Sequence, residues 1–276
     1  MVKERIVNKH IMNHLEANSL ISSSQHGFCS KRSVDINLLE SYSLVTDLLE
    51  KGVSVDILLL DLAKAFDKVC HRYPIHRRRT LSLRPQVISW IEDFLRDRTQ
   101  QVKVTTGPNS QALSDEVKFT SRVPQGSVLG LTLFNIYIIE LALITSNKTT
   151  LYVDDSKLIG PANTPSTLQS LQTDLNHTCS RFKRWLLEFN TEKFKIIYFG
   201  HNNHKQQYLM TQYPGIHQIP EHVQEERDLG VYVDSHLNFS SHSQKISAHA
   251  SRALGIIKHS ITSRSREVIT KLYKGL

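Results

Sequence analysis

Cysteine is scarce in this sequence, with only Cys29, Cys70 and Cys179 among 276 residues. The three are far apart and include no Cys-x-x-Cys pair, so their spacing does not indicate a zinc ribbon. An odd number of widely separated thiols gives no disulfide framework and fits a reducing environment. The sequence therefore predicts a protein that acts inside the cell and is not secreted.

Long apolar segments are missing as well. Residues 1–10 carry charges among a few apolar side chains and lack the apolar core of a signal peptide. The most apolar stretch, residues 133–144, contains Asn135 and Glu140 and is too short to span a bilayer. Neither an internal repeat nor a low-complexity linker is visible. The sequence therefore gives no indication of a membrane partner.

Basic side chains, in contrast, are in surplus. The sequence holds 34 Lys and Arg against 26 Asp and Glu, which gives a net charge of +8. Such a surplus favours an anionic partner, most often nucleic acid, because Lys and Arg neutralise phosphates and release counterions. Charge alone fits a soluble basic protein equally well. The run His-Arg-Arg-Arg at 76–79 is a candidate contact with a duplex, although a solvated basic surface more often explains such a run.

Apolar side chains recur at helical or strand spacing along most of the chain. A mostly apolar run over residues 53–60 predicts a buried strand that ends immediately before Asp61. Two short strands, over 149–153 and 156–160, are expected to join at Asp154-Asp155. The other expected helices cover residues 36–49, 85–95, 129–141, 165–186 and 246–257, and the other expected strands cover 101–105, 194–199 and 229–233.

The order of these elements predicts where the acidic residues meet. From the strand before Asp61 onward the order is β-α-β-β-α-β, which is typical of the ferredoxin-like arrangement, with an insertion over residues 71–120. A right-handed crossover makes the first two strands parallel, and the hairpin then runs the third strand antiparallel to the first. If the first and third strands are neighbours, Asp61 lies beside the turn that carries Asp154 and Asp155. The pattern thus predicts an α+β domain in which three carboxylates converge.

Converging carboxylates repel one another unless cations neutralise them. Oxygen ligands suit Mg²⁺, which binds a few carboxylates together with substrate phosphates. Two such ions activate a 3′-hydroxyl for attack and stabilise a pyrophosphate leaving group. An isolated Asp-Asp pair is more often a solvated turn. Asp61 at the end of an apolar strand favours a site instead, because carboxylates are seldom placed beside a core.

Six segments resemble motifs of non-LTR reverse transcriptases, in the same order and at similar spacing. Residues 61–69, Asp-Leu-Ala-Lys-Ala-Phe-Asp-Lys-Val, resemble motif A, and residues 123–130, Val-Pro-Gln-Gly-Ser-Val-Leu-Gly, resemble motif B. Residues 152–155, Tyr-Val-Asp-Asp, look like the motif C box. The remaining three are a fingers segment at 20–33 with Gln-His-Gly-Phe at 25–28, motif D at 190–193 (Asn-Thr-Glu-Lys), and a primer grip at 226–231 (Glu-Arg-Asp-Leu-Gly-Val). Any one match is weak, whereas six in register are highly specific for LINE-type retrotransposons.

The resemblance implies an α+β right-hand polymerase with a ferredoxin-like βαββαβ palm, partial fingers and a partial thumb. It implies an RNA-directed DNA polymerase, a nucleotidyltransferase that adds dNTPs to a DNA primer on an RNA template, in the nucleus and cytoplasm. Two Mg²⁺ ions would serve it, with Mn²⁺ as a substitute, and no small-molecule organic cofactor is implied. The expected reverse transcriptase domain covers 1–233, with partial fingers at 1–52 and 71–120, the palm at 53–70 and 121–233, and the start of the thumb at 234–276.

The resemblance also implies roles for single residues. Asp61 and Asp154 correspond to the principal metal ligands and Asp155 to a supporting acid. Phe66 falls where the family has a bulky side chain that excludes a ribose 2′-hydroxyl, although a core aromatic fits equally. Lys193 is similar to a lysine that assists pyrophosphate departure, although a plain surface lysine is equally consistent.

Motif B and the primer grip supply four further candidates. Gln125 and Gly126 are expected beneath the incoming nucleotide, where glycine permits close approach of the backbone. Leu229 and Gly230 are expected to support the primer end, or else to belong to the core of a strand.

The chain also departs from the family pattern. Family members usually have an Arg-Pro-Ile fingers segment, and this chain starts immediately after that point, while its thumb is barely begun. Arg122 stands in place of a glycine, Leu131 in place of a proline and Val153 in place of an alanine. These departures leave a second hypothesis open, a catalytically silent, truncated retrotransposon remnant that is inert or only binds nucleic acid.

Overall fold

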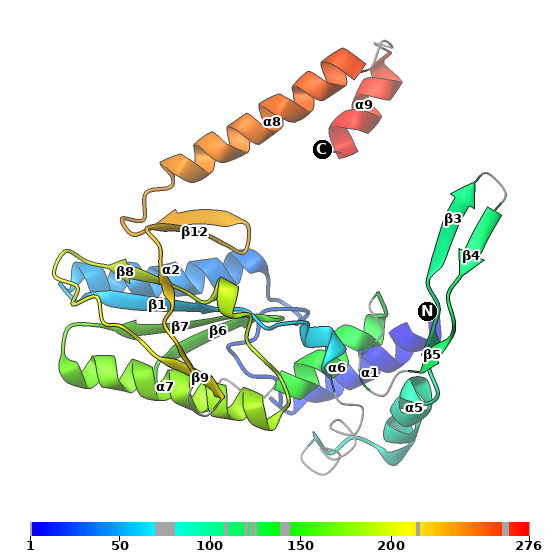
Figure 1. The fold of residues 1–276 in the computed structure, drawn as a ribbon, viewed down its shortest axis with the longest axis horizontal. Coiled ribbons are helices and arrows are strands. Elements are labelled where there is room, and N and C mark those ends of the chain that lie inside the picture. The colour runs from blue at the N-terminus through cyan, green and yellow to red at the C-terminus, as the bar shows by residue number, and fades with distance from the viewer. Residues whose placement is uncertain are drawn as a thin grey trace. The chain divides into compact units, whose positions relative to one another are not determined.

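The structure, a computed structural model, describes residues 2–69, 81–107, 110–118, 121, 123, 126–138, 144–213, 216–260 and 265–275. The chain forms two compact units, Met1–His222 and Val223–Leu276 (Figure 1). Among the described helices, none has the length and apolar character needed to cross a membrane.

A five-stranded sheet forms the centre of the first unit (Figure 1). Its order is β11-β8-β1-β7-β6, with β1 antiparallel to both of its neighbours and with β6 and β7 forming a hairpin. The first and third strands of the predicted βαββαβ unit, β1 and β7, are therefore neighbours, which confirms the expected order. The strands are β1 (Val55–Leu60), β6 (Lys148–Tyr152), β7 (Asp155–Pro161), β8 (Lys195–Phe199) and β11 (Glu221–His222).

Both faces of this sheet are buried: successive side chains of a strand point to opposite faces, and nearly all of those on β1 and β7 are buried. One face carries the main core together with α7 (Pro165–Arg184), and α2 (Val34–Glu50) covers the other face (Figure 1). Two rows of fully buried side chains cross the three central strands, Leu58 with Leu158 and Ile196 toward the main core, and Ile57 with Ile159 and Ile197 on the opposite face.

Side-chain caps determine where the two covering helices begin. At the start of α2, Ser33 Oγ accepts a hydrogen bond from the backbone N–H of Ile36. At the start of α7, Thr164 and Thr167 form a capping box, and Pro165 occupies the first turn. The start of α7 agrees with the expected helix over 165–186, whereas α2 begins two residues before the expected helix over 36–49.

The sequence analysis did not predict the first helix, α1 (Val2–Ala17). It packs against α6 (Val128–Ile138), which follows motif B and buries almost every side chain. Within α1 only Ile11 and Leu15 are fully buried. Two buried positions in 16 residues give a weak apolar stripe, so the pattern alone does not reveal the helix.

The remaining elements surround this framework or form the second unit. The strand expected over 101–105 is one arm of an antiparallel pair, β3 with β4. The remaining elements of the first unit are η1 (Ala65–Asp67), α5 (Pro85–Leu95), β2 (Thr99–Gln100), β3 (Lys103–Gly107), β4 (Ser110–Leu113), β5 (Val117–Lys118), η3 (Thr191–Lys193), β9 (Met210–Tyr213) and β10 (Ile216–Gln218). Those of the second unit are β12 (Glu225–Asp228), β13 (Val231–Asp234), α8 (Ser240–Ser260) and α9 (Arg266–Gly275).

The hairpin of the second unit corrects one expectation. The sequence predicts a strand over 229–233, but Leu229 and Gly230 form the two-residue turn between β12 and β13. Their φ angles are 46° and 98°, and a tight two-residue hairpin favours such positive values. The interpretation of either residue as strand core is therefore wrong.

A buried carboxylate on β1 joins the sheet to the loop that follows β8. Asp56 has no exposed surface, and its oxygens accept hydrogen bonds from Asn203 Nδ2 and Tyr208 Oη, both at 2.7 Å. Burial raises the pKa of Asp56 from 3.8 to about 6, although the hydrogen bonds from Asn203 and Tyr208 oppose the rise. The folded state therefore favours the protonated form of this side chain.

The raised pKa of Asp56 predicts a pH-dependent stability. Protonation of Asp56 stabilises the fold fully below pH 3.8, and this contribution is lost as the pH rises through about 6. Asp56→Asn removes the titration, so wild type should lose about 2 kcal/mol of unfolding free energy relative to the variant between pH 4.5 and 7.5. Urea unfolding of both proteins at the two pH values measures the difference. Parallel pH profiles would contradict the assignment.

Candidate active site

The aspartate at the end of β1 lies next to the turn between β6 and β7. Leu60, the last residue of β1, is paired with Ser156 of β7, so Asp61 follows beside the start of that strand. Tyr152 is paired with Asp155 across the hairpin, which leaves Val153 and Asp154 as its two turn residues. Residues about 90 positions apart in the chain are thus brought together by one antiparallel pairing.

The segment after β1 is held in place by the loop that carries motif D. Ala63 N–H donates to the carbonyl of Glu188, and Asn190 N–H donates to the carbonyl of Asp61, both at 2.8 Å. Leu62 and Phe189 form the isolated antiparallel bridge between these two contacts. Asp61 is therefore fixed from both sides, by β1 before it and by this bridge after it.

The three aspartates differ in exposure. Asp61 is buried, with 12% of its side chain exposed, Asp154 is half-buried and Asp155 is exposed. Burial raises the pKa of Asp154, and the negative charge of Asp61 raises it further. This effect on Asp154 agrees with the strand pairing, which brings the two carboxylates close enough to repel each other. Such a pair attracts a cation.

Lys193 supplies a positive charge to this carboxylate pair. Its Nζ lies 3.1 Å from Asp61 Oδ2, and the side chain of Asn190 caps its short helix η3 by accepting from the N–H of Glu192. The hydrogen bond with Asp61 raises the pKa of Lys193, and the charges of Asp155 and Asp154 add to the rise. The motif D lysine therefore forms an ion pair with Asp61, although 63% of its side chain is exposed.

The donor set is suited to Mg²⁺ through two carboxylates. In the described part of the chain, no three His, Cys, Asp or Glu side chains are gathered as a group that could hold a metal ion by themselves. Mg²⁺ commonly binds one or two carboxylates and takes its other ligands from water and substrate phosphates. Asp61 and Asp154 meet this requirement, and the ammonium of Lys193 already neutralises part of their negative charge through its ion pair with Asp61.

Phe66 lies in η1, five residues after Asp61. It is half-buried, packs against the core, and its ring centroid is 4.9 Å from that of Phe134 in α6. This position fits both interpretations of the residue, because one side of the ring contacts the core and the rest is accessible.

The other candidates belong to motif B, the basic run and the primer grip. Gly126 has a φ of 81°, which favours glycine, and apart from its chain neighbours no described residue has an atom within 4 Å of the position that a Cβ would take. Gln125 and the basic run at 76–79 lie outside the described residues. Leu229 and Gly230 belong to the second unit, whereas the aspartates belong to the first.

Comparison with known proteins agrees with this arrangement of motifs. A family model described as "Reverse transcriptase (RNA-dependent DNA polymerase)" matches residues 1–257. The chain belongs to the reverse transcriptase family. The match includes all six motif segments and the sheet that brings Asp61 to the β6–β7 turn.

Relatives at the sequence level come from mobile elements. The chain is 26% identical over 258 residues to the RNA-directed DNA polymerase from mobile element jockey of Drosophila funebris. It is 23% identical over 248 residues to the probable RNA-directed DNA polymerase from transposon BS of Drosophila melanogaster. Each alignment covers 87% of this chain and 26% of the relative, so the chain spans about a quarter of the length of these relatives.

Solved structures with a similar fold include telomerases of Candida tropicalis. The apo telomerase truncated from its C-terminal domain has a TM-score of 0.51 at 15% identity, covering 87% of this chain and 44% of that one. The apo telomerase without this truncation has a TM-score of 0.53 at 12% identity, covering 86% and 39%. At these identities the likeness shows the fold alone, which is consistent with a right-hand polymerase.

Proposed function

We propose that this chain is the polymerase part of a non-LTR retrotransposon and extends a DNA primer with dNTPs on an RNA template. The observation that carries the proposal is the meeting of Asp61 with the Val153-Asp154 turn, with Lys193 beside them. A repelling carboxylate pair next to a cationic side chain suits a reaction in which a polyphosphate substrate brings in Mg²⁺.

In the proposed reaction the primer 3′-oxygen attacks the α-phosphorus of the dNTP, and the bond from that phosphorus to the pyrophosphate oxygen breaks. Bound Mg²⁺ ions, two of them in this proposal with Mn²⁺ as a substitute, would activate the hydroxyl and neutralise charge on the phosphates. Asp61 and Asp154 would hold these ions. The exposed Asp155 would add negative charge near the site and so help to attract them. Lys193 would stabilise the departing pyrophosphate with its ammonium.

The substrate would be selected by residues around this pair. Phe66 would fill the space that a ribose 2′-hydroxyl needs, while Gln125 and Gly126 would lie beneath the incoming base. Among the described residues outside its own chain neighbours, none crowds the position of a Cβ at Gly126, which favours close approach of its backbone. Leu229 and Gly230 would support the primer end through the tight turn that they form.

The proposal also assigns parts of the chain to the subdomains of a polymerase. We assign partial fingers to 1–52 and 71–120, the palm to 53–70 and 121–233, and the start of the thumb to 234–276. The boundary between the two compact units falls after His222, so the primer-grip hairpin belongs to the same compact unit as α8 and α9. RNA and dNTPs are found in the nucleus and cytoplasm, which is where the proposed reaction would occur.

Primer extension tests the proposal. The purified chain is incubated with an RNA template, a labelled DNA primer, dNTPs and Mg²⁺, and the product is resolved by length. Template-directed extension that needs Mg²⁺ is the expected result. A protein that binds the RNA–DNA duplex in a salt-sensitive way but extends no primer with either Mg²⁺ or Mn²⁺ would favour the silent remnant instead.

A further inference from the structure

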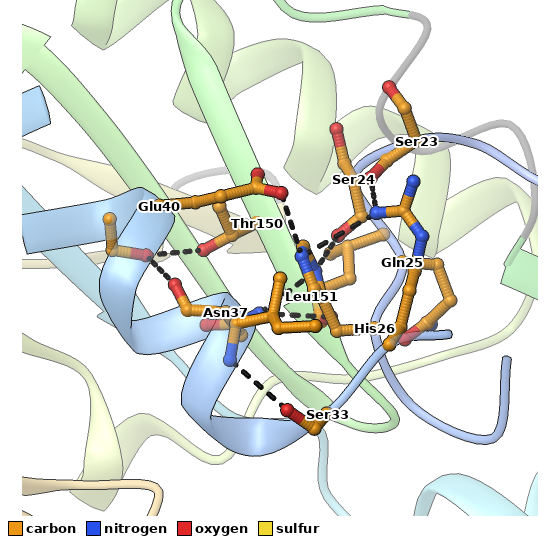
Figure 2. Close-up of polar contacts among 12 residues, drawn as sticks. Ser23, Ser24, Gln25, His26, Ser33, Asn37, Glu40, Thr150 and Leu151 are labelled. Carbon is orange, nitrogen blue, oxygen red and sulfur yellow. Dashed lines mark hydrogen bonds and ion pairs between the residues drawn. The ribbon is translucent and has the colours of Figure 1, made fainter. Parts of the chain in front are cut away.

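The Gln-His-Gly-Phe segment lies against the strand that leads into the Val153-Asp154 turn. Gln25 forms an isolated parallel bridge with Leu151, the residue next to the end of β6. His26 N–H donates to the carbonyl of Leu151 at 2.9 Å, and Leu151 N–H donates to the carbonyl of Ser24 at 2.8 Å. The segment is therefore joined to β6 through this one bridge and its two backbone hydrogen bonds (Figure 2).

The side chain of Gln25 continues from this bridge to the turn itself. It is buried, with 3% exposed surface, and its Oε1 accepts from Gly27 N–H at 2.7 Å and from Val153 N–H at 3.3 Å. Val153 has a φ of 60°, which is an outlier for a β-branched residue. A strained backbone of this kind persists only when its surroundings hold it. Gln25 supplies such a hold at the residue before Asp154.

Gly27 approaches the same turn closely at Val153. A Cβ at Gly27 would lie 2.6 Å from Val153 Cγ2 and 2.7 Å from the Val153 nitrogen, distances that real Cβ contacts do not show. The carbonyl of Gly27 accepts from Asn135 Nδ2 of α6 at 2.9 Å. The segment is thus fixed between the motif B helix and the Val153-Asp154 turn, and only glycine fits there.

A second set of contacts joins the same region to α2 but away from the turn. Glu40 Oε1 lies 3.4 Å from His26 Nε2, and Glu40 Oε2 lies 2.9 Å from Nζ of Lys148, at the opposite end of β6 from the turn. Asn37 Nδ2 donates to the carbonyl of Leu151 at 3.2 Å (Figure 2). These contacts dock α2 on β6 without touching Val153, so they provide a matched control.

We propose that Gln25 and Gly27 are positioning residues that hold the Val153-Asp154 turn so that Asp154 faces Asp61. The proposal rests on the proposed function, in which these two carboxylates hold the catalytic metal ions. Gln25 acts by accepting a hydrogen bond from the backbone N–H of Val153. Gly27 acts by lacking a Cβ, which allows the Val153 backbone to approach it closely. A displacement of about 1 Å at a reacting centre costs on the order of a hundredfold in rate.

Hydrogen exchange of the intact chain tests the contact directly. Gln25→Met keeps the length of the side chain but removes the acceptor, so the Val153 amide should exchange about tenfold faster, the equivalent of one lost hydrogen bond. Glu40→Gln loosens the α2 contacts and should leave the Val153 amide unchanged. Gly27→Ala is a second variant, expected to speed exchange in the same peptide by displacing the turn.

The second measurement is primer extension with the same variants. Gln25→Met and Gly27→Ala should lower kcat by about a hundredfold while KM for dNTP changes little, and Glu40→Gln should retain most activity. Equal activity losses in Glu40→Gln and Gln25→Met would overturn the proposal in favour of simple docking. Unchanged Val153 exchange in Gln25→Met would overturn it too. An inactive wild type would contradict the proposed function, and the exchange result would still decide the role of Gln25.

Discussion

We expect Asp154→Asn to lower RNA-templated primer extension by on the order of 10³-fold. Asparagine keeps the size of the side chain but removes the negative charge that pairs with Asp61 in attracting cations. Asp61→Asn should have an effect of the same size, since both carboxylates belong to one site. Asp155→Asn should cost only about tenfold, because the exposed carboxylate acts through screened charge. Single-turnover rates at saturating dNTP and Mg²⁺ measure the order.

The control for this series is Asp56→Asn, the same substitution on the same strand. Asp56 is bonded to Asn203 and Tyr208 in the core and contacts no proposed substrate. Its variant should therefore extend the primer at the wild-type rate near pH 7.5. If Asp155→Asn were as damaging as Asp154→Asn, the distinction drawn from their exposure would be wrong.

Phe66→Ala should raise incorporation of ribonucleotides relative to deoxyribonucleotides by about 10- to 100-fold. The half-buried ring lies in η1, shortly after Asp61, and its removal frees space for a 2′-hydroxyl, so discrimination by a clash is lost. Competing extension with CTP and dCTP on one template measures the ratio of kcat/KM values.

Phe66→Tyr keeps the ring and should retain discrimination. Phe134→Leu alters the packing partner of Phe66, 4.9 Å away, without opening the same space, and it should change stability more than selectivity. Unchanged discrimination in Phe66→Ala would return this residue to its interpretation as a core aromatic.

Much of the palm could be predicted because its signals are local or topological. The apolar run before Asp61 and the short apolar segments on either side of Asp154-Asp155 each predict a strand, and each is a strand in the structure. The right-handed crossover then allows few arrangements, and one of them makes β1 and β7 neighbours. The start of α7 follows from Thr164 and Pro165 alone.

Other features depend on contacts that no local pattern records. The hydrogen bond from Val153 to Gln25 joins residues 128 positions apart and depends on a positive φ that a β-branched residue rarely adopts. The motif match placed Gln25 in a fingers segment but gave no role to its side chain. Leu229 was expected in a strand because it is apolar, whereas the following glycine favours a two-residue turn, the signal that was missed.

Mn²⁺ binding tests most directly whether Asp61 and Asp154 together hold the divalent cations. Electron paramagnetic resonance measures free Mn²⁺ during titration of the wild-type chain and its variants with a nonhydrolysable dNTP present. We expect Asp61→Asn and Asp154→Asn each to weaken binding at least about tenfold, since each removes one of two carboxylate ligands. Asp155→Asn should weaken it less, and Asp56→Asn not at all. Wild-type affinity in both Asp61→Asn and Asp154→Asn would contradict the account.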